Sequence, residues 1–213
     1  MTLLERLKIE TRPAHDRIER AVDIEGRITS LAAYRALLAR FYGFHAAWEP
    51  SAEAALGDAA FFRERRKTGL LVRDLQALGM GEGEIARLPL CDLAVPVSGP
   101  AAALGGMYVV EGSTLGGMII ARLVERRLGL STETGCGYFR SYGSAVGVMW
   151  RSFGARLLSV STPETDDTIV ASANDTFEAM RAWLSEDPLP RAHFAPSSGR
   201  STMRSSAGAV PGA

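Results

Sequence analysis

Three residues near the N-terminus have the types and spacing that suit a planar metal cofactor. His15 and Glu19 are four residues apart, so on a helix they stand one turn apart on the same face. A carboxylate there can accept from the imidazole Nδ1–H and leave Nε2 free to bind a metal. Lys8 precedes His15 by seven residues, which places a cation about 10 Å away on that face, where an anionic edge of the cofactor would lie. Taken alone, a surface histidine in a salt-bridged helix face is the simpler interpretation.

The other two histidines are weaker candidates. His193 lies in the C-terminal segment, which is rich in proline, serine and glycine. His45 belongs to an aromatic helical stretch, and we expect a neighbouring side chain to satisfy its ring. His15 is therefore the predicted metal ligand.

A second unusual stretch is residues 101–128, AAALGGMYVVEGSTLGGMIIARLVERRL, which is apolar and helix-like but contains five glycines. Each interior glycine costs a helix about 0.5–1 kcal/mol relative to alanine, so another purpose is expected. At 3.6 residues per turn, Gly105, Gly112 and Gly116 share one face and leave a bare strip of backbone. A flat ligand can lie on such a strip, or a second helix can approach it closely, and the glycines alone do not decide between these.

Helices joined by short polar turns are predicted along the whole chain, because the apolar residues recur at helical spacing and alternating strand patterns are nearly absent. Pro13 should break the first helix at residues 12–13, and Pro50 should end the second. Glycines 79 and 129 should end later helices. The predicted ranges are 2–22, 31–48, 59–78, 82–88, 142–160 and 163–185, and the glycine-rich helix should start at Ser98 and Pro100 and stop at Gly129.

Composition excludes several classes of protein. The 213 residues, 46% of them hydrophobic, suffice for one domain, which we place at residues 1–185, followed by a disordered tail over 186–213. Basic and acidic residues both number 24, so nucleic acid is not an expected partner. Glu111 lies within the one stretch long enough to span a bilayer, which favours a buried soluble helix. Two isolated cysteines and the absence of a signal-peptide pattern indicate a cytoplasmic protein.

Two segments carry a resemblance to a known family. The run RLKIETRPAHDRIE at residues 6–19, followed by YVVEGSTLGGMIIARLVERRLGL at residues 108–130, resembles the heme oxygenases, especially the bacterial biliverdin-forming enzymes that accompany bacteriophytochromes. The resemblance implies an all-α, single-domain fold that holds heme b between a proximal helix and a distal helix kinked around Gly112–Gly117. It makes His15 the axial ligand and Glu19 its carboxylate partner.

The same resemblance assigns further site residues. Lys8, and Arg151 in the run MWRSFG, match basic residues that the family places near the heme propionates, and Tyr108 joins the residues expected to contact the cofactor. The distal residues expected to act in catalysis are Gly112, Ser113, Gly116 and Gly117. Ser113 replaces an aspartate that animal members carry after the first distal glycine, so other groups must organise the distal water.

The implied reaction is oxidative cleavage of heme at a meso carbon, with O2, to biliverdin, carbon monoxide and iron. Neutral imidazole leaves one side of the iron open for dioxygen. Electrons must come from a ferredoxin or a flavoprotein reductase, because no GxGxxG fingerprint follows a strand, and a bacteriophytochrome is a possible recipient of the product. The alternatives are a non-catalytic heme carrier or gas sensor on the same fold, a thiaminase-like hydrolase that would need a cysteine nucleophile, and a purely structural bundle.

Overall fold

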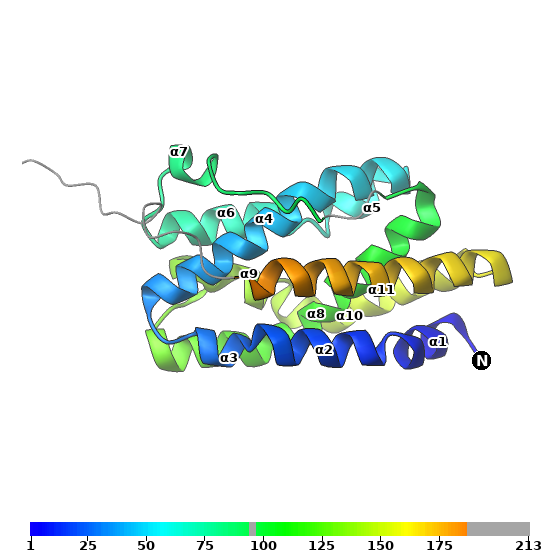
Figure 1. Cartoon of the computed structure of the whole chain (residues 1–213), viewed down its shortest axis with the longest axis horizontal. Coiled ribbons are helices and arrows are strands. Elements are labelled where there is room, and N and C mark those ends of the chain that lie inside the picture. Colours follow the sequence, from blue (N-terminus) through cyan, green and yellow to red (C-terminus); the bar gives the residue numbers. More distant parts are fainter. Residues whose placement is uncertain (94–96, 187–213) are drawn as a thin grey trace, which may run out of the picture.

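The computed structural model describes residues 1–93 and 97–186, and within these ranges the chain is helical and contains no strand (Figure 1). The all-α prediction is confirmed. Most of the predicted tail, from residue 187 onward, lies outside the described residues. The α-helices are α1 (Leu3–Glu10), α2 (Arg12–Val22), α3 (Ile24–Arg27), α4 (Leu31–Leu56), α5 (Ala59–Arg63), α6 (Thr68–Ala77), α7 (Glu82–Ile85), α8 (Gly99–Leu128), α9 (Gly137–Arg140), α10 (Val146–Ser159) and α11 (Pro163–Ser185).

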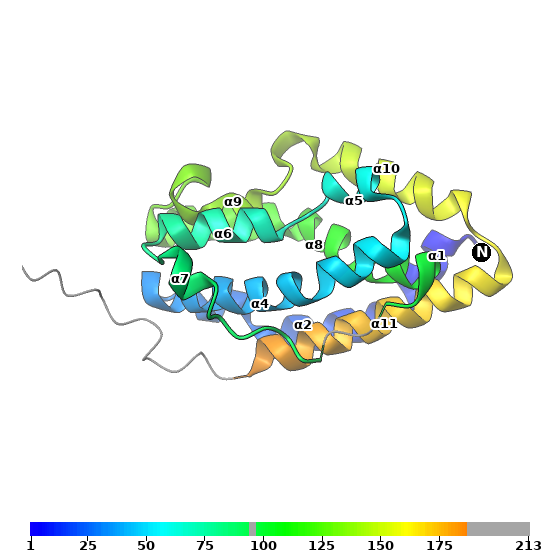
Figure 2. The same cartoon turned by 90° about the horizontal axis from the view of Figure 1, so that it is seen from above.

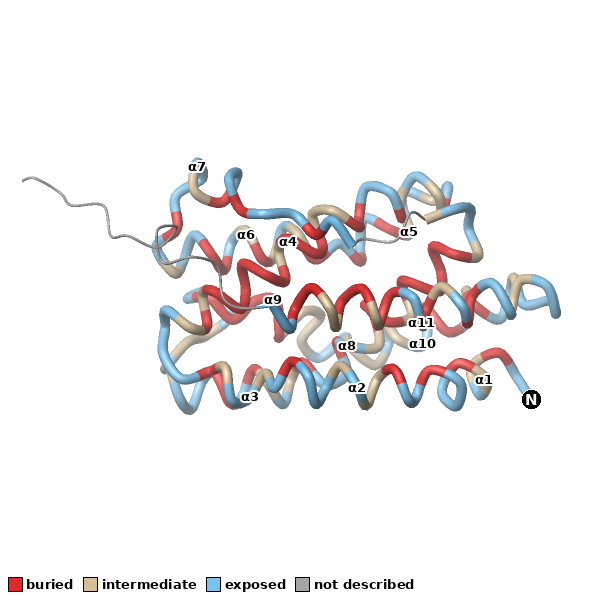
Figure 3. Tube along the Cα trace, viewed as in Figure 1, coloured by how far each residue is buried: buried red, intermediate tan, exposed pale blue. Residues whose placement is uncertain are grey.

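The glycine-rich helix α8 is the centre of the bundle. It packs against α11, α4, α9 and α10, while α2 packs against α11 on another side. In Figure 1 the first half of α8 descends across the bundle and its second half turns toward the end where α3 lies, with which α8 is in contact, as expected for a bent distal helix. Figure 2 shows α4 and α11 side by side, with α10 at the opposite edge. Figure 3 shows that the buried positions follow the inner faces of α4, α8 and α11.

Local signals in the sequence set several helix ends. Thr2 and Glu5 form the predicted capping box, in which the Thr2 amide donates to Glu5 Oε2 at 2.7 Å. Pro13 lies in the first turn of α2, so the break between α1 and α2 falls at Thr11. Gly129 ends α8 with φ +68°, a left-handed conformation that glycine adopts without a Cβ penalty. The last helix, α11, has the predicted bounds.

The prediction that Pro50 ends the second helix is wrong. α4 continues to Leu56 and ends at Gly57, with Pro50 inside it. Pro50 faces solvent, whereas Ala52 and Leu56 after it are buried. Burial of these two apolar side chains therefore offsets the amide donor that the proline removes.

The predicted helix over 59–78 is two helices, because a buried carboxylate interrupts it. Glu49 on α4 accepts hydrogen bonds from the backbone amides of Lys67, at 2.6 Å, and Thr68, at 3.2 Å. The Thr68 hydroxyl also donates to Glu49, at 2.7 Å. These bonds satisfy the free amides at the start of α6 from outside the helix. The predicted helix over 142–160 likewise begins later, at Val146, after a 3-10 turn at Gly143–Ala145.

Candidate functional site

A cavity of about 560 Å³ lies between α2 and α8 and is closed at its sides by α9, α10 and α11. It brings together eight of the nine predicted site residues from segments about a hundred positions apart in the chain. These eight are Lys8, His15, Glu19, Tyr108, Gly112, Ser113, Gly116 and Gly117. Apolar side chains from α11 and α2 supply much of the remaining wall, as is usual in cavities that bind flat organic ligands.

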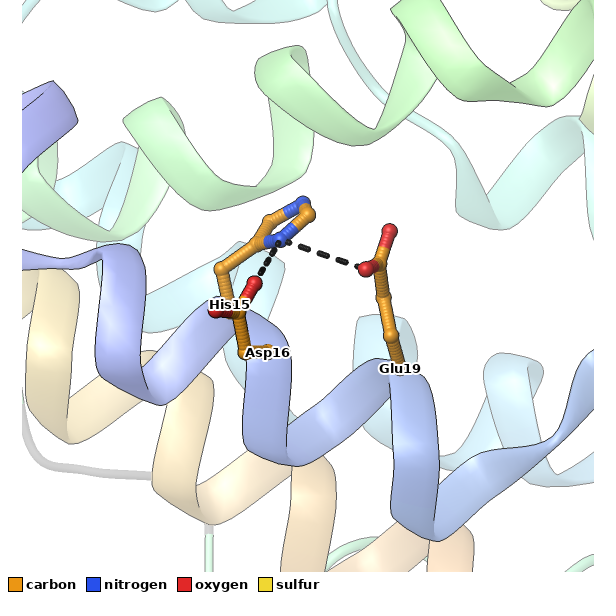
Figure 4. Close-up of side chains that lie close together, drawn as sticks. All are labelled: His15, Asp16 and Glu19. Atoms are coloured by element: carbon orange, nitrogen blue, oxygen red, sulfur yellow. Dashed lines mark ion pairs between the residues drawn. The ribbon is translucent and has the colours of Figure 1, made fainter.

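The His15 ring stands away from α2 toward α8, with Nδ1 facing two carboxylates (Figure 4). Nδ1 lies 3.6 Å from Glu19 Oε2 and 3.8 Å from Asp16 Oδ1, and it is buried without a hydrogen-bond partner. The ring packs edge-on against Phe177, with centroids 5.7 Å apart. Both carboxylates face Nδ1, and Nε2 points away from them, toward α8.

Asp16 was missed at the sequence level. The helical periodicity pointed to Glu19 one turn away, but the side chain of the adjacent residue also bends toward Nδ1. Asp16 is held in place by Arg12, whose Nε donates to Asp16 Oδ1 at 2.8 Å. The carboxylates of Asp16 and Glu19 therefore both face Nδ1, where the sequence predicted only that of Glu19.

Two of the glycines present open space to the cavity. A Cβ on Gly116 would meet no atom within 4 Å, and one on Gly112 would meet only the Trp150 ring, at 3.8 Å. Neither glycine therefore lies at a close helix crossing. At these two positions the bare backbone lines the same cavity as His15.

The predicted strip of three glycines does not face one partner along its whole length. A Cβ on Gly105 would lie 2.3 Å from the carbonyl oxygen of Ile169 on α11, so this glycine allows a close helix crossing. Gly117, predicted as a distal catalytic residue, lines the cavity but also packs against the backbone of α9, where its Cβ would lie 2.5 Å from the Phe139 carbonyl oxygen. The close approach of a second segment is therefore confirmed at Gly105 and Gly117, whereas Gly112 and Gly116 are open toward the cavity.

The rim of the cavity carries basic side chains. Lys8 on α1 is exposed and lines the cavity, together with Arg12. Arg151 on α10 is also exposed but is not among the residues that line the cavity, although its neighbour Trp150 is. The structure thus brings Lys8 to the site and leaves Arg151 outside the cavity wall.

Ser113 and Tyr108 add polar groups to the α8 wall. The Ser113 hydroxyl donates to the carbonyl oxygen of Val110 at 2.7 Å, so it can only accept from a further partner in the cavity. Tyr108 packs its ring against Trp150 at a centroid distance of 5.7 Å. Desolvation raises the pKa of Tyr108, which keeps its hydroxyl protonated at neutral pH.

A buried polar network behind α8 was not predicted from the sequence. Lys67, which also lines the cavity, forms an ion pair with Glu111 at 3.1 Å, and His45 Nε2 lies 3.1 Å from the hydroxyl of Tyr138. His45 Nε2 thus has the expected neighbour, while Nδ1 lies 3.5 Å from Glu49 Oε1. Two signals in the sequence point to this network: Lys67 is one of two lysines, and Glu111 lies in the middle of an apolar helix.

Glu49 should make the protein sensitive to acid. Burial raises its pKa more than any other single cause, but His45 and the donors from Lys67 and Thr68 together outweigh burial, and the pKa is lowered below its ordinary value of 4.5. The unfolded chain therefore binds the proton first as pH falls, so the stability from Glu49 is present above pH 4.5 and is lost below it.

We expect Glu49→Gln to lower the free energy of unfolding by about 1–3 kcal/mol at pH 7 and to flatten the decline of that free energy as the pH falls below 4.5. Urea melts of both proteins at several pH values measure this. Glu53→Gln is the matched control, since Glu53 lies one turn further along α4 and pairs with Arg66 near the surface. Parallel pH profiles for wild type and Glu49→Gln would contradict the expectation.

Cysteine chemistry is not supported. Burial raises the pKa of Cys136 to about 11, so its thiol stays protonated at neutral pH. A thiol in that state is a poor nucleophile. This removes the basis for the thiaminase-like alternative at Cys136.

By length and composition, α8 is the one helix within the described ranges that is apolar enough to cross a membrane, and half of the relevant stretch is buried in the fold. The core helix of a globular protein has the same properties. The buried Glu111 near its middle fits that interpretation.

The fold and the cavity define an all-helical protein with a cavity between a histidine-bearing helix and a glycine-bearing helix. The chain belongs to the heme oxygenase family, whose family model matches residues 1–186. It is accordingly an oxidoreductase that degrades heme. None of the curated proteins matches the sequence.

Solved structures of heme oxygenases share the fold. The enzyme from Neisseria meningitidis, described with NO and CO bound, superposes with a TM-score of 0.74 at 23% identity, covering 91% of this chain and 92% of that one. The enzyme from Leptospira interrogans gives a TM-score of 0.72 at 18% identity, covering 87% and 99%. Heme oxygenase 2 from Chlamydomonas reinhardtii, without heme, gives 0.70 at 19% identity, covering 89% and 99%.

Proposed function

We propose that the chain cleaves heme b at a meso carbon and releases biliverdin, carbon monoxide and iron, with O2 and externally supplied electrons. One observation carries this proposal: His15 lines one side of the cavity, and the open backbone at Gly112 and Gly116 lines the other. The residues present fit heme: an imidazole with one nitrogen free, a bare surface facing it, and a cation at the rim. When bound, heme supplies the redox chemistry of the reaction.

The protein's own residues have separate tasks in this proposal. His15 Nε2 would ligate the iron, and Asp16 and Glu19, which face Nδ1, would keep the proton on that nitrogen. Gly112 and Gly116, which carry no side chain, would leave room for dioxygen on the α8 side of the cavity. Ser113, whose own proton is used by the Val110 carbonyl, accepts a hydrogen bond from distal water.

The partners follow from the chemistry. No GxGxxG fingerprint for a flavin or nicotinamide follows a strand in the sequence, so we propose a ferredoxin or flavoprotein reductase as the electron donor. A cytoplasmic location and delivery of biliverdin to a bacteriophytochrome belong to the same proposal.

Aerobic incubation of the purified protein with hemin and ascorbate tests the function. We expect the Soret band to disappear as biliverdin forms, and chromatography of the bilin to identify the meso carbon attacked. An anaerobic sample is the control. Tight heme binding with no bilin formed, both with ascorbate and with a ferredoxin and its reductase, would show a heme carrier or gas sensor instead.

Lys8 and Arg151 should differ in their effects on heme binding. The propionates are anionic and need charged donors, and Lys8 lines the cavity whereas Arg151 does not. We expect Lys8→Ala to weaken heme affinity by about tenfold, the equivalent of one charge-assisted contact, and to broaden the mixture of biliverdin isomers. Arg151→Ala should have the smaller effect. Heme titration and isomer analysis measure both, and equal effects from the two variants would contradict the difference in position.

A further inference from the structure

Glu111 on α8 is the centre of a buried polar cluster that the proposed chemistry does not use. Lys67 Nζ and the Tyr142 hydroxyl both donate to Glu111 Oε1, at 3.1 Å and 2.7 Å. Lys67 Nζ also donates to the Tyr142 hydroxyl at 2.6 Å and to the Arg65 carbonyl at 2.9 Å, so all three of its protons are used. The side chains of Lys67 and Glu111 are each 2% exposed.

The three members come from three separate parts of the chain. Lys67 lies in the connection between α5 and α6, Glu111 lies in α8, and Tyr142 lies in the connection between α9 and α10. A single cluster therefore ties two connecting segments to the central helix. We refer to Glu111, Lys67 and Tyr142 as the buried anchor.

The backbone beside Tyr142 is in an unusual conformation. Ser141 has φ +42° and ψ −110°, a left-handed value that residues with a Cβ rarely adopt. Such a conformation persists only where its surroundings hold it. The Ser141 amide donates to the Gly137 carbonyl at 2.8 Å on one side, and the buried anchor fixes Tyr142 on the other.

Both elements held by the buried anchor continue directly into the cavity wall. Gly112 follows Glu111 on α8, and α10, which begins four residues after Tyr142, carries Trp150. The Trp150 ring lies 3.8 Å from the place that a Cβ on Gly112 would take, and it packs against Tyr108. A displacement of α8 or of the α9–α10 connection would therefore change this part of the wall.

We propose that Glu111, Lys67 and Tyr142 are positioning residues that set the placement of Gly112 and Trp150 in the cavity and thereby the part of the heme ring that dioxygen can reach. A buried ion pair is often no more stabilising than apolar side chains of the same volume, so its value here is in fixing a position. The consequence for cleavage rests on the proposed function, whereas the positioning itself is a property of the apo protein.

Hydrogen exchange of the apo protein, followed by mass spectrometry, tests the positioning. The double variant Glu111→Met/Lys67→Met removes one charge of each sign at similar volume. Arg65 lies 3.7 Å from Glu111 Oε2 and loses that partner, but it keeps its hydrogen bonds to the Phe61 carbonyl and the Ser152 hydroxyl, so the variant should stay folded. Tyr142→Phe removes only the hydroxyl. We expect both to raise exchange about tenfold or more in peptides covering residues 108–119 and 141–150, with α11 unchanged. The matched control is Glu125→Gln, which removes an exposed ion pair between α8 and Arg140 and should leave both segments unchanged.

The heme-loaded variants supply the second readout. With cleavage established for the wild type, the double variant should give a changed biliverdin isomer mixture while the control keeps the wild-type mixture. Wild-type exchange in both segments would overturn the proposal, and so would faster exchange in every helix including α11, which marks loss of stability alone. If the wild type binds heme without cleaving it, the proposed function fails, but the exchange result still decides whether the buried anchor positions the wall.

Discussion

Replacing His15 with alanine should nearly abolish heme cleavage while the bundle stays folded. The His15 side chain is 46% exposed and packs edge-on against Phe177, so its loss removes little of the core. Residues that only orient a ligand already change activity by about 10–100-fold, so loss of the ligand itself should cost more. Bound heme should also lose the absorption spectrum of neutral imidazole ligation, and added imidazole should restore part of the turnover.

Two further variants complete this experiment. Arg17→Ala removes an exposed side chain of α2 that pairs with Glu178 and does not line the cavity, so it should behave as wild type. Glu19→Gln should have only a graded effect, because Asp16 also faces Nδ1. Wild-type turnover by His15→Ala without added imidazole would mean that another residue ligates the iron.

Adding a methyl group at Gly116 should slow cleavage strongly without harming the fold. No atom lies within 4 Å of the new Cβ, and alanine favours a helix by up to about 1 kcal/mol over glycine, so the apo protein should be as stable as wild type or more so. The methyl group enters the space opposite His15 that dioxygen needs, and cleavage should fall by at least about tenfold, the effect of about 1.4 kcal/mol on the barrier. Gly112→Ala should act similarly, with Trp150 at 3.8 Å.

Gly105→Ala is the matched control, because it adds the same atom to the same helix where α8 crosses α11. Its Cβ would lie 2.3 Å from the Ile169 carbonyl oxygen, so we expect a loss of about 1–3 kcal/mol in the free energy of unfolding. Specific activity per folded molecule should change little. Apo thermal melts and hemin turnover separate the two cases, and the reverse pattern, with Gly116→Ala unstable but fully active, would rule out the ligand surface.

Much of the fold was accessible from sequence because its signals are local. The capping box at Thr2, the proline in the first turn of α2 and the bounds of α11 each depend on residues within a few positions of one another. Pro50 misled the prediction because burial of Ala52 and Leu56, a tertiary effect, outweighs the local preference of proline.

In the candidate site, too, the residues placed by local spacing were predicted and the contacts made by distant segments were not. His15, Glu19 and Lys8 were found because helical spacing places them on one face, and all three line the cavity. Gly105 was grouped with Gly112 because both lie on one face of an ideal helix, but seven residues span about 10 Å along the axis, and over that distance α8 passes from α11 to the cavity. The buried anchor joins residues 44 and 31 positions apart, a pairing that a single sequence does not encode locally.

The close approach of Gly117 to the Phe139 carbonyl has a consequence for any library of variants made in this chain. A screen that selects only for soluble protein should retain glycine at Gly117 and accept many residues at Gly116, since only the first is in contact with backbone. A screen for green pigment should retain glycine at both. Comparing the two selections position by position would thus map where α8 is constrained by its neighbours and where it is constrained by what it binds.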